Sequence, residues 1–99
     1  MTYQVRFTRE ARADLKRLLG SLAMVDPALA RKAQRKIDKS VSVLQDFPFT
    51  CRKALPENSF LRELVIRFGT SGYVALFEIE DDQFITVLAV RHQREDDYL

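Results

Sequence analysis

The strongest constraint on the fold is a group of three apolar segments near the C-terminus. They span residues 60–68, 73–79 and 84–91, and two short polar connections, 69–72 and 80–83, separate them. Connections of this length join neighbouring antiparallel strands. Because apolar residues occupy most positions of the last two segments, we expect those strands to be buried on both faces. The sequence therefore predicts an antiparallel three-stranded meander.

The first half of the chain has the pattern of one strand followed by two helices. Residues 3–7 alternate between apolar and polar, which is typical of a half-buried strand. Thr8 offers an N-cap for a helix that we expect to end near Gly20-Ser21 or shortly after. Asp26-Pro27 marks the start of a second helix, expected over residues 27–45. Two consecutive helices joined by a short loop form an antiparallel hairpin.

Residues 48–59 have weak periodicity, and we expect a loop there. A loop of this length is long for a compact domain and favours a functional role, such as delivering Arg52 and Lys53 to a site. The predicted order is strand, helix, helix, then three strands and a short C-terminal tail. This order indicates a single α+β domain over residues 1–99, with a helical hairpin on one face of a mainly antiparallel sheet that includes the first strand.

The composition excludes several classes of protein. With 46% hydrophobic and 30% charged residues, the chain is too apolar for a disordered protein. No apolar run approaches the ~20 residues of a membrane span, and residues 1–6 lack a signal-peptide core. The single cysteine, Cys51, cannot form an internal disulfide, and no cluster of cysteine and histidine could hold zinc. We expect a cytoplasmic protein that uses no metal and no cofactor.

The charge is unevenly distributed along the chain. Residues 1–40 contain ten Lys/Arg against four Asp/Glu, whereas residues 41–99 contain six against ten. The second predicted helix has a basic outer face, made of Arg31, Lys32, Arg35, Lys36 and Lys39. Such a face binds nucleic acid or an acidic partner protein, or it is simply a solvated surface.

The polar tail after the last strand carries the candidate functional groups. They are the only histidine, His92, together with Arg91, Arg94 and Tyr98. An imidazole serves as acid or base, or it hydrogen-bonds the end of the sheet. The arginines bind phosphate or an acidic protein surface, or they pair with the acidic residues 95–97. The tyrosine stacks on a base or packs on the core, so the residues leave open whether the tail contacts RNA or a protein.

Taken together, the element order and three segments resemble the RelE/ParE superfamily of toxins from bacterial type II toxin–antitoxin modules. The segments are Leu61-Arg62-Glu63-Leu64, residues 72–79 and residues 87–95, and the resemblance covers essentially the whole chain. It implies a cytosolic toxin of the plasmid-stabilisation type that inhibits growth. A cognate antitoxin, encoded by the adjacent gene, would hold it inactive and would bring it to operator DNA.

Within this superfamily, the residues favour the ParE-like branch. ParE-like members poison DNA gyrase and commonly end their last strand with a His-x-Arg pattern, which His92-Gln93-Arg94 fits. RelE-like members typically have an arginine after the Gly-Tyr of the middle meander strand, where this chain has Val74. The resemblance thus implies a gyrase-directed toxin whose target-binding residues are Arg91, His92, Arg94 and Tyr98.

The alternative that the resemblance implies is a ribosome-dependent mRNA endoribonuclease. Its catalytic residues would be Lys53, His92, Arg94 and Tyr98. In either branch, the basic face of the second helix is a candidate antitoxin-binding surface. A sheet that is apolar on both faces, with helices enough for one, also predicts an apolar surface that a partner covers.

Overall fold

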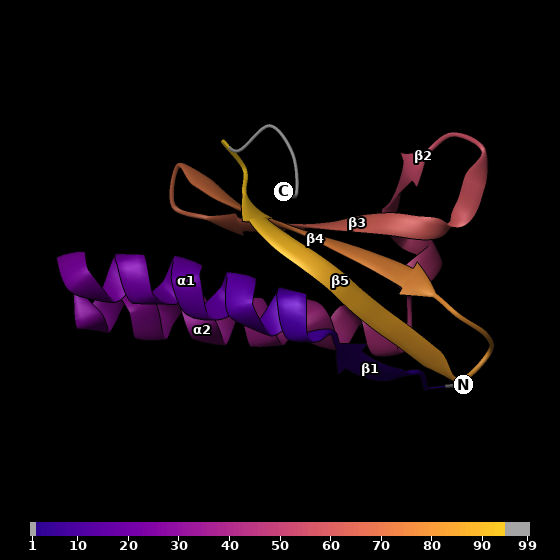
Figure 1. Ribbon diagram of the computed structural model, residues 1–99, viewed down its shortest axis with the longest axis horizontal. Helices are drawn as coiled ribbons and strands as arrows, with labels where there is room; N and C mark the ends of the chain where they lie inside the picture. The colour runs from indigo at the N-terminus through magenta and orange to yellow at the C-terminus, as the bar shows by residue number, and fades with distance from the viewer. Residues whose placement is uncertain (1, 95–99) are drawn as a thin grey trace.

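Two antiparallel helices lie on one face of a five-stranded sheet in the computed structural model, which describes residues 2–94 (Figure 1). The elements, in chain order, are β1 (Gln4–Phe7), α1 (Arg9–Val25), α2 (Pro27–Ser42), two 3-10 turns (Val43–Gln45 and Pro48–Thr50), β2 (Arg52–Leu55), β3 (Asn58–Phe68), β4 (Ser71–Ile79) and β5 (Phe84–His92). The predicted α+β class and the helical hairpin are confirmed.

The sheet has the strand order β1-β5-β4-β3-β2. The strands β3, β4 and β5 form the predicted antiparallel meander. β1 joins the same sheet, as predicted, and pairs in parallel with β5, so that Val5 lies opposite Ile85. The first and last strands of the chain are therefore neighbours in the sheet, with the start of β1 beside the start of β5 (Figure 1).

The predicted loop over residues 48–59 is wrong, because β2 lies inside it. β2 has neither alternation nor β-branched residues, so the sequence pattern gives no strand signal. Its backbone pairs with the long strand β3, where Arg52 lies opposite Glu63, and this tertiary pairing overrides the weak local preference. β2 is a short edge strand with two cations, which is how sheets commonly protect a free edge.

Both predicted N-caps are present. The Thr8 hydroxyl oxygen accepts a hydrogen bond from the Ala11 amide at 3.0 Å, and an Asp26 carboxylate oxygen accepts one from the Ala28 amide at 3.0 Å. α1 continues past the predicted end near Gly20 to Val25. A glycine in a helix interior costs only about 1 kcal/mol relative to alanine. Packing of the following turn, including Leu22, against the core offsets a cost of that size.

The core lies between the helices and the sheet, and the middle of the sheet is buried on both faces. Phe77 and Val87 are fully buried beneath the helices. Val74, which alternates with the core residues of β4, is only 2% exposed although it faces away from the helices. The predicted burial of the last two strands on both faces is therefore confirmed.

A β-bulge in β5 changes the register of the meander. Phe77 pairs with Val87 but Leu76 pairs with Ala89, so Leu88 is an extra residue on β5. The segment after β1 bonds to β5 next to this bulge. The Thr8 hydroxyl donates to the Leu88 carbonyl oxygen at 3.1 Å, and the Val90 amide donates to an Asp14 carboxylate oxygen at 2.9 Å. After the bulge, Val90 rather than Ala89 joins the core beneath the helices.

We predict that Asp14→Ala destabilises the fold by about 1–3 kcal/mol, since it leaves the amide of buried Val90 without its acceptor. Urea denaturation measures the change. Asp38→Ala is the matched control, because that carboxylate is exposed and, within residues 2–94, its hydrogen bond is to the neighbouring Gln34 side chain at 3.0 Å. Equal midpoints for the two variants would contradict the role given to Asp14.

We also predict that Gly72→Ala destabilises the fold by about 2 kcal/mol or more. A Cβ at Gly72 would lie 2.1 Å from the backbone oxygen of Ile66, so the strands β3 and β4 would have to separate. Gly20→Ala is the control: a Cβ there meets nothing within 4 Å, and removing a glycine from a helix should stabilise it by up to about 1 kcal/mol. Opposite shifts in the thermal midpoint are expected, and a neutral Gly72→Ala would refute the close approach.

Candidate functional site

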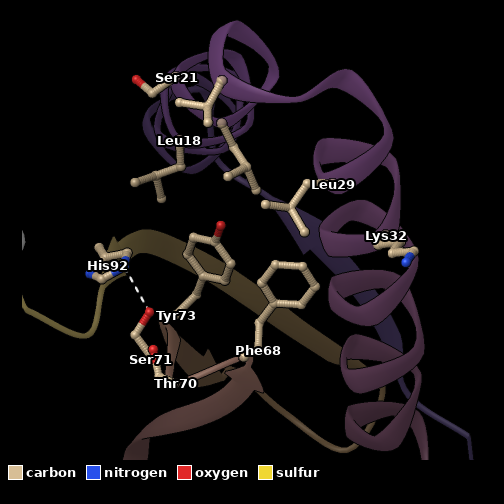
Figure 2. Close-up of a pocket in the computed structure, with 12 residues that line it drawn as sticks. Leu18, Ser21, Leu29, Lys32, Phe68, Thr70, Ser71, Tyr73 and His92 are labelled. Atoms are coloured by element: carbon tan, nitrogen blue, oxygen red, sulfur yellow. Dashed lines mark hydrogen bonds between the residues drawn. The ribbon is translucent and has the colours of Figure 1, made fainter.

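The helical hairpin extends past the sheet (Figure 1), and an apolar pocket of about 700 Å³ opens there, next to the end of β5 (Figure 2). Six apolar or aromatic side chains line it: Leu18, Leu22, Val25, Leu29, Phe68 and Tyr73. Its polar lining consists of Ser21, Lys32, Thr70, Ser71 and His92, with Gly69 in the turn between β3 and β4. Among residues 2–94, no carboxylate lines the pocket. The pocket therefore suits a ligand surface that is mainly apolar and whose charged groups are negative rather than positive.

His92 ends β5 and forms part of the pocket wall, beside Tyr73 of the neighbouring strand (Figure 2). The two rings are nearly perpendicular, with centroids 5.8 Å apart. The imidazole Nε2 lies 3.2 Å from Ser71 Oγ, and Nδ1 accepts a hydrogen bond from the Arg94 amide at 3.1 Å. Since Nδ1 is an acceptor, the proton of the neutral ring is on Nε2, which donates to the Ser71 hydroxyl oxygen.

Arg91 leaves β5 on the opposite face from His92, because it pairs with Val74. Its Nη1 donates to the carbonyl oxygens of His92 and Gln93 at 3.3 and 3.4 Å, and Nη2 lies 4.0 Å from a Glu63 carboxylate oxygen. Arg94 is exposed beyond the end of the strand. The structure thus separates Arg91 from His92 and leaves Arg94 accessible, and Tyr98 lies outside the described residues.

Lys53 lies far from His92. It is on β2 opposite Arg62, whereas Tyr73, the partner of His92, pairs with Ile66 of β3. Three strand spacings therefore separate the two residues laterally, about 14 Å, and four residues along β3 add about 13 Å. The structure does not bring Lys53 together with His92 and Arg94.

The basic face of α2 is exposed at all five positions, Arg31, Lys32, Arg35, Lys36 and Lys39. Within residues 2–94 none of these side chains forms an ion pair. Lys32 is the member that also lines the pocket (Figure 2). The basic face and the apolar pocket are therefore neighbouring parts of one surface.

Two groups near the site or in the core have shifted pKa values. Burial raises the pKa of the Tyr73 phenol, so its hydroxyl stays protonated in the pocket. Burial also raises the pKa of the Cys51 thiol, and the nearby Arg62 guanidinium offsets part of this effect. A thiol with a raised pKa is a poor nucleophile at neutral pH, in line with the absence of an acid–base partner beside it in the sequence.

Other classes of site are not found in the part of the chain that the structure describes. Residues 2–94 contain no group of three or more His, Cys, Asp or Glu side chains arranged to hold a metal ion. No helix among them has the length and apolar character that a membrane crossing requires.

The sequence pattern did not reveal the pocket or the roles of Ser71 and Tyr73. Counting the register from the turn at residues 80–83, where Ile79 pairs with Ile85, would place Arg91 opposite Tyr73. The bulge shifts the pairing by one residue and places His92 there instead. No local signal in β5 marks the bulge, so this part of the site depended on the structure.

Comparisons with known proteins agree with this fold. A chain from a chromosomal ParDE toxin–antitoxin system of P. aeruginosa superposes with a TM-score of 0.71 at 24% sequence identity, and the match covers 96% of this chain and 98% of that chain. At 24% identity, this similarity is evidence for the fold alone. The comparison with curated proteins returned no match. The family model described as the ParE toxin of the type II toxin–antitoxin system parDE matches residues 5–97. This match extends over nearly all of the sequence, and the chain therefore belongs to the ParE toxin family.

Proposed function

We propose that this ParE-type toxin binds and inhibits DNA gyrase, and that a cognate antitoxin neutralises it by tight binding. The observation that carries the proposal is the end of β5, where His92-Gln93-Arg94 leaves the sheet with its turn held by hydrogen bonds. Arg94 is exposed there and suits an acidic protein surface. The antitoxin and gyrase assignments both rest on the family and on this geometry.

The alternative of RNA cleavage has less support from the arrangement of side chains. Cleavage at a 2′-hydroxyl needs a base, an acid and cations close to one phosphate. Among residues 2–94, the one imidazole is engaged at both nitrogens, and Lys53 lies at the far end of the sheet. Val74, at the position where RelE-like toxins have an arginine, is 2% exposed and apolar. This arrangement favours recognition of a protein over catalysis.

The antitoxin proposal is supported by apolar surface at the tip of the helical hairpin. Val25, which lines the pocket, is 80% exposed, and its neighbour Met24 is 90% exposed. Contiguous exposed apolar surface of this kind is typical of a protein interface. The neighbouring basic face of α2 favours a partner segment that combines apolar and acidic residues, such as an amphipathic helix laid into a groove.

We predict that the purified chain inhibits gyrase supercoiling at near-stoichiometric concentration and that Arg94→Ala weakens the inhibition by about tenfold or more, through loss of charge-assisted hydrogen bonds. Arg67→Ala is the control and should retain full inhibition, because Arg67 is also an exposed arginine but lies on β3. Unaffected gyrase at a large excess of toxin would reject this function. Codon-positioned cuts in mRNA during in vitro translation, lost in Arg94→Ala, would assign the endoribonuclease activity instead.

For the antitoxin, we predict that Leu22→Glu lowers its affinity by at least about tenfold, because a carboxylate is placed in the apolar pocket. Calorimetric titration with the protein encoded by the adjacent gene measures the change. Phe60→Glu is the control, since Phe60 is 53% exposed near the start of β3, eight residues from Phe68 of the pocket. Equal affinities of the two variants, both folded by circular dichroism, would place the antitoxin elsewhere.

A further inference from the structure

The end of β5 depends on a side chain that the sequence did not single out, Ser71. Ser71 is the first residue of β4, and its hydroxyl oxygen lies 3.2 Å from His92 Nε2 (Figure 2). We infer that Ser71 is a positioning residue that holds the His92 ring in the orientation in which Nδ1 accepts the Arg94 amide, and that this contact in turn fixes the backbone that presents Arg94. The consequence for target binding rests on the proposed function, whereas the structural role does not.

The turn after β5 is tied to the sheet at successive residues. The Gln93 amide donates to the Gly72 carbonyl oxygen at 2.9 Å. The Arg91 guanidinium contacts the carbonyl oxygens of His92 and Gln93. Within residues 2–94, the backbone of Arg94 makes its hydrogen bond to the His92 imidazole, at 3.1 Å. The direction in which Arg94 leaves the turn therefore depends on the state of one imidazole nitrogen.

That nitrogen, Nδ1, accepts the Arg94 amide only when it carries no proton. A neutral imidazole exchanges its proton between the two nitrogens, and the hydrogen bond at one nitrogen decides the form at the other. The Arg94 amide can only donate, so it requires an unprotonated Nδ1 and leaves the proton on Nε2. The Ser71 hydroxyl can donate or accept, so it does not choose the form, but its contact with Nε2 holds the ring in the orientation that points Nδ1 at the Arg94 amide. Tyr73 packs edge-to-face against the ring with centroids 5.8 Å apart, which limits rotation of the ring away from Ser71.

Thr70 offers a comparison for the hydroxyl of Ser71. Thr70 is adjacent to Ser71 and also lines the pocket, but within the described residues its side chain makes no hydrogen bond to His92. The two residues offer a matched pair for testing, since each replacement by alanine removes one hydroxyl from the same turn of the pocket wall.

The test uses the full-length chain labelled with ¹⁵N at histidine. Because His92 is the only histidine, its two ring nitrogens give the only imidazole signals. In alkaline buffer, where a histidine side chain is neutral, we expect the pattern of the Nε2–H form in the wild type. Ser71→Ala removes the hydrogen-bond partner of Nε2 and should therefore move the Nε2 signal. It should also speed hydrogen exchange of the Arg94 amide by about threefold to tenfold, the change expected from loss of one neutral hydrogen bond.

Two control variants separate positioning from a general effect on the fold. Ser71→Thr restores the hydroxyl and should restore the wild-type signals, and Thr70→Ala should leave them unchanged. An Nδ1–H pattern in the wild type, or unchanged signals and exchange in folded Ser71→Ala, would overturn the inference. The supercoiling assay is read separately: Ser71→Ala should weaken inhibition, but by less than Arg94→Ala. If the wild type fails to inhibit gyrase, the proposed function fails while the imidazole signals still decide the role of Ser71.

Discussion

The β-bulge at Leu88 determines which side chains at the C-terminal end of β5 face each side of the sheet. Successive side chains of a strand point to opposite faces, so one extra residue exchanges the faces of everything that follows it. Before the bulge, Val87 lies beneath the helices; after it, Val90 and then His92 do. The bulge is held by side chains of the segment after β1, where Thr8 and Asp14 bond to the backbone of β5. The first helical residues thus influence the register of the last strand.

The candidate site follows from that register. With His92 opposite Tyr73, the imidazole reaches Ser71 and closes one side of the apolar pocket. The other wall comes from the helical hairpin, whose tip extends past the sheet because α1 continues through Gly20 (Figure 1). An apolar pocket and a fixed polar turn therefore lie side by side. The pocket, which suits a partner protein, is therefore next to the residues that follow β5.

Much of the fold was predictable because its signals are local or periodic. The meander follows from apolar segments with short connections, and Thr8 and Asp26 mark the helix starts through capping chemistry. β2 was missed because its four residues carry no strand pattern. They form a strand through backbone pairing with β3, which the sequence pattern of β2 does not reveal. Of the candidate site, His92 and Arg94 were singled out from their position after a buried strand. Ser71 and the pocket were not, because they arise from contacts between segments far apart in the sequence.

By itself, the sequence determined the α+β class, the order of the strands within the meander, the helical hairpin and the polar groups that follow the last strand. It also carried a family resemblance that the match over residues 5–97 supports. Only the tertiary structure decided that His92 rather than Arg91 lies on the face covered by the helices, opposite Tyr73, and that Lys53 lies far from His92. The physical reason is that side-chain direction in a sheet depends on register. Here the register is set by a bulge whose backbone groups are bonded by Thr8 and Asp14, more than seventy residues away along the chain.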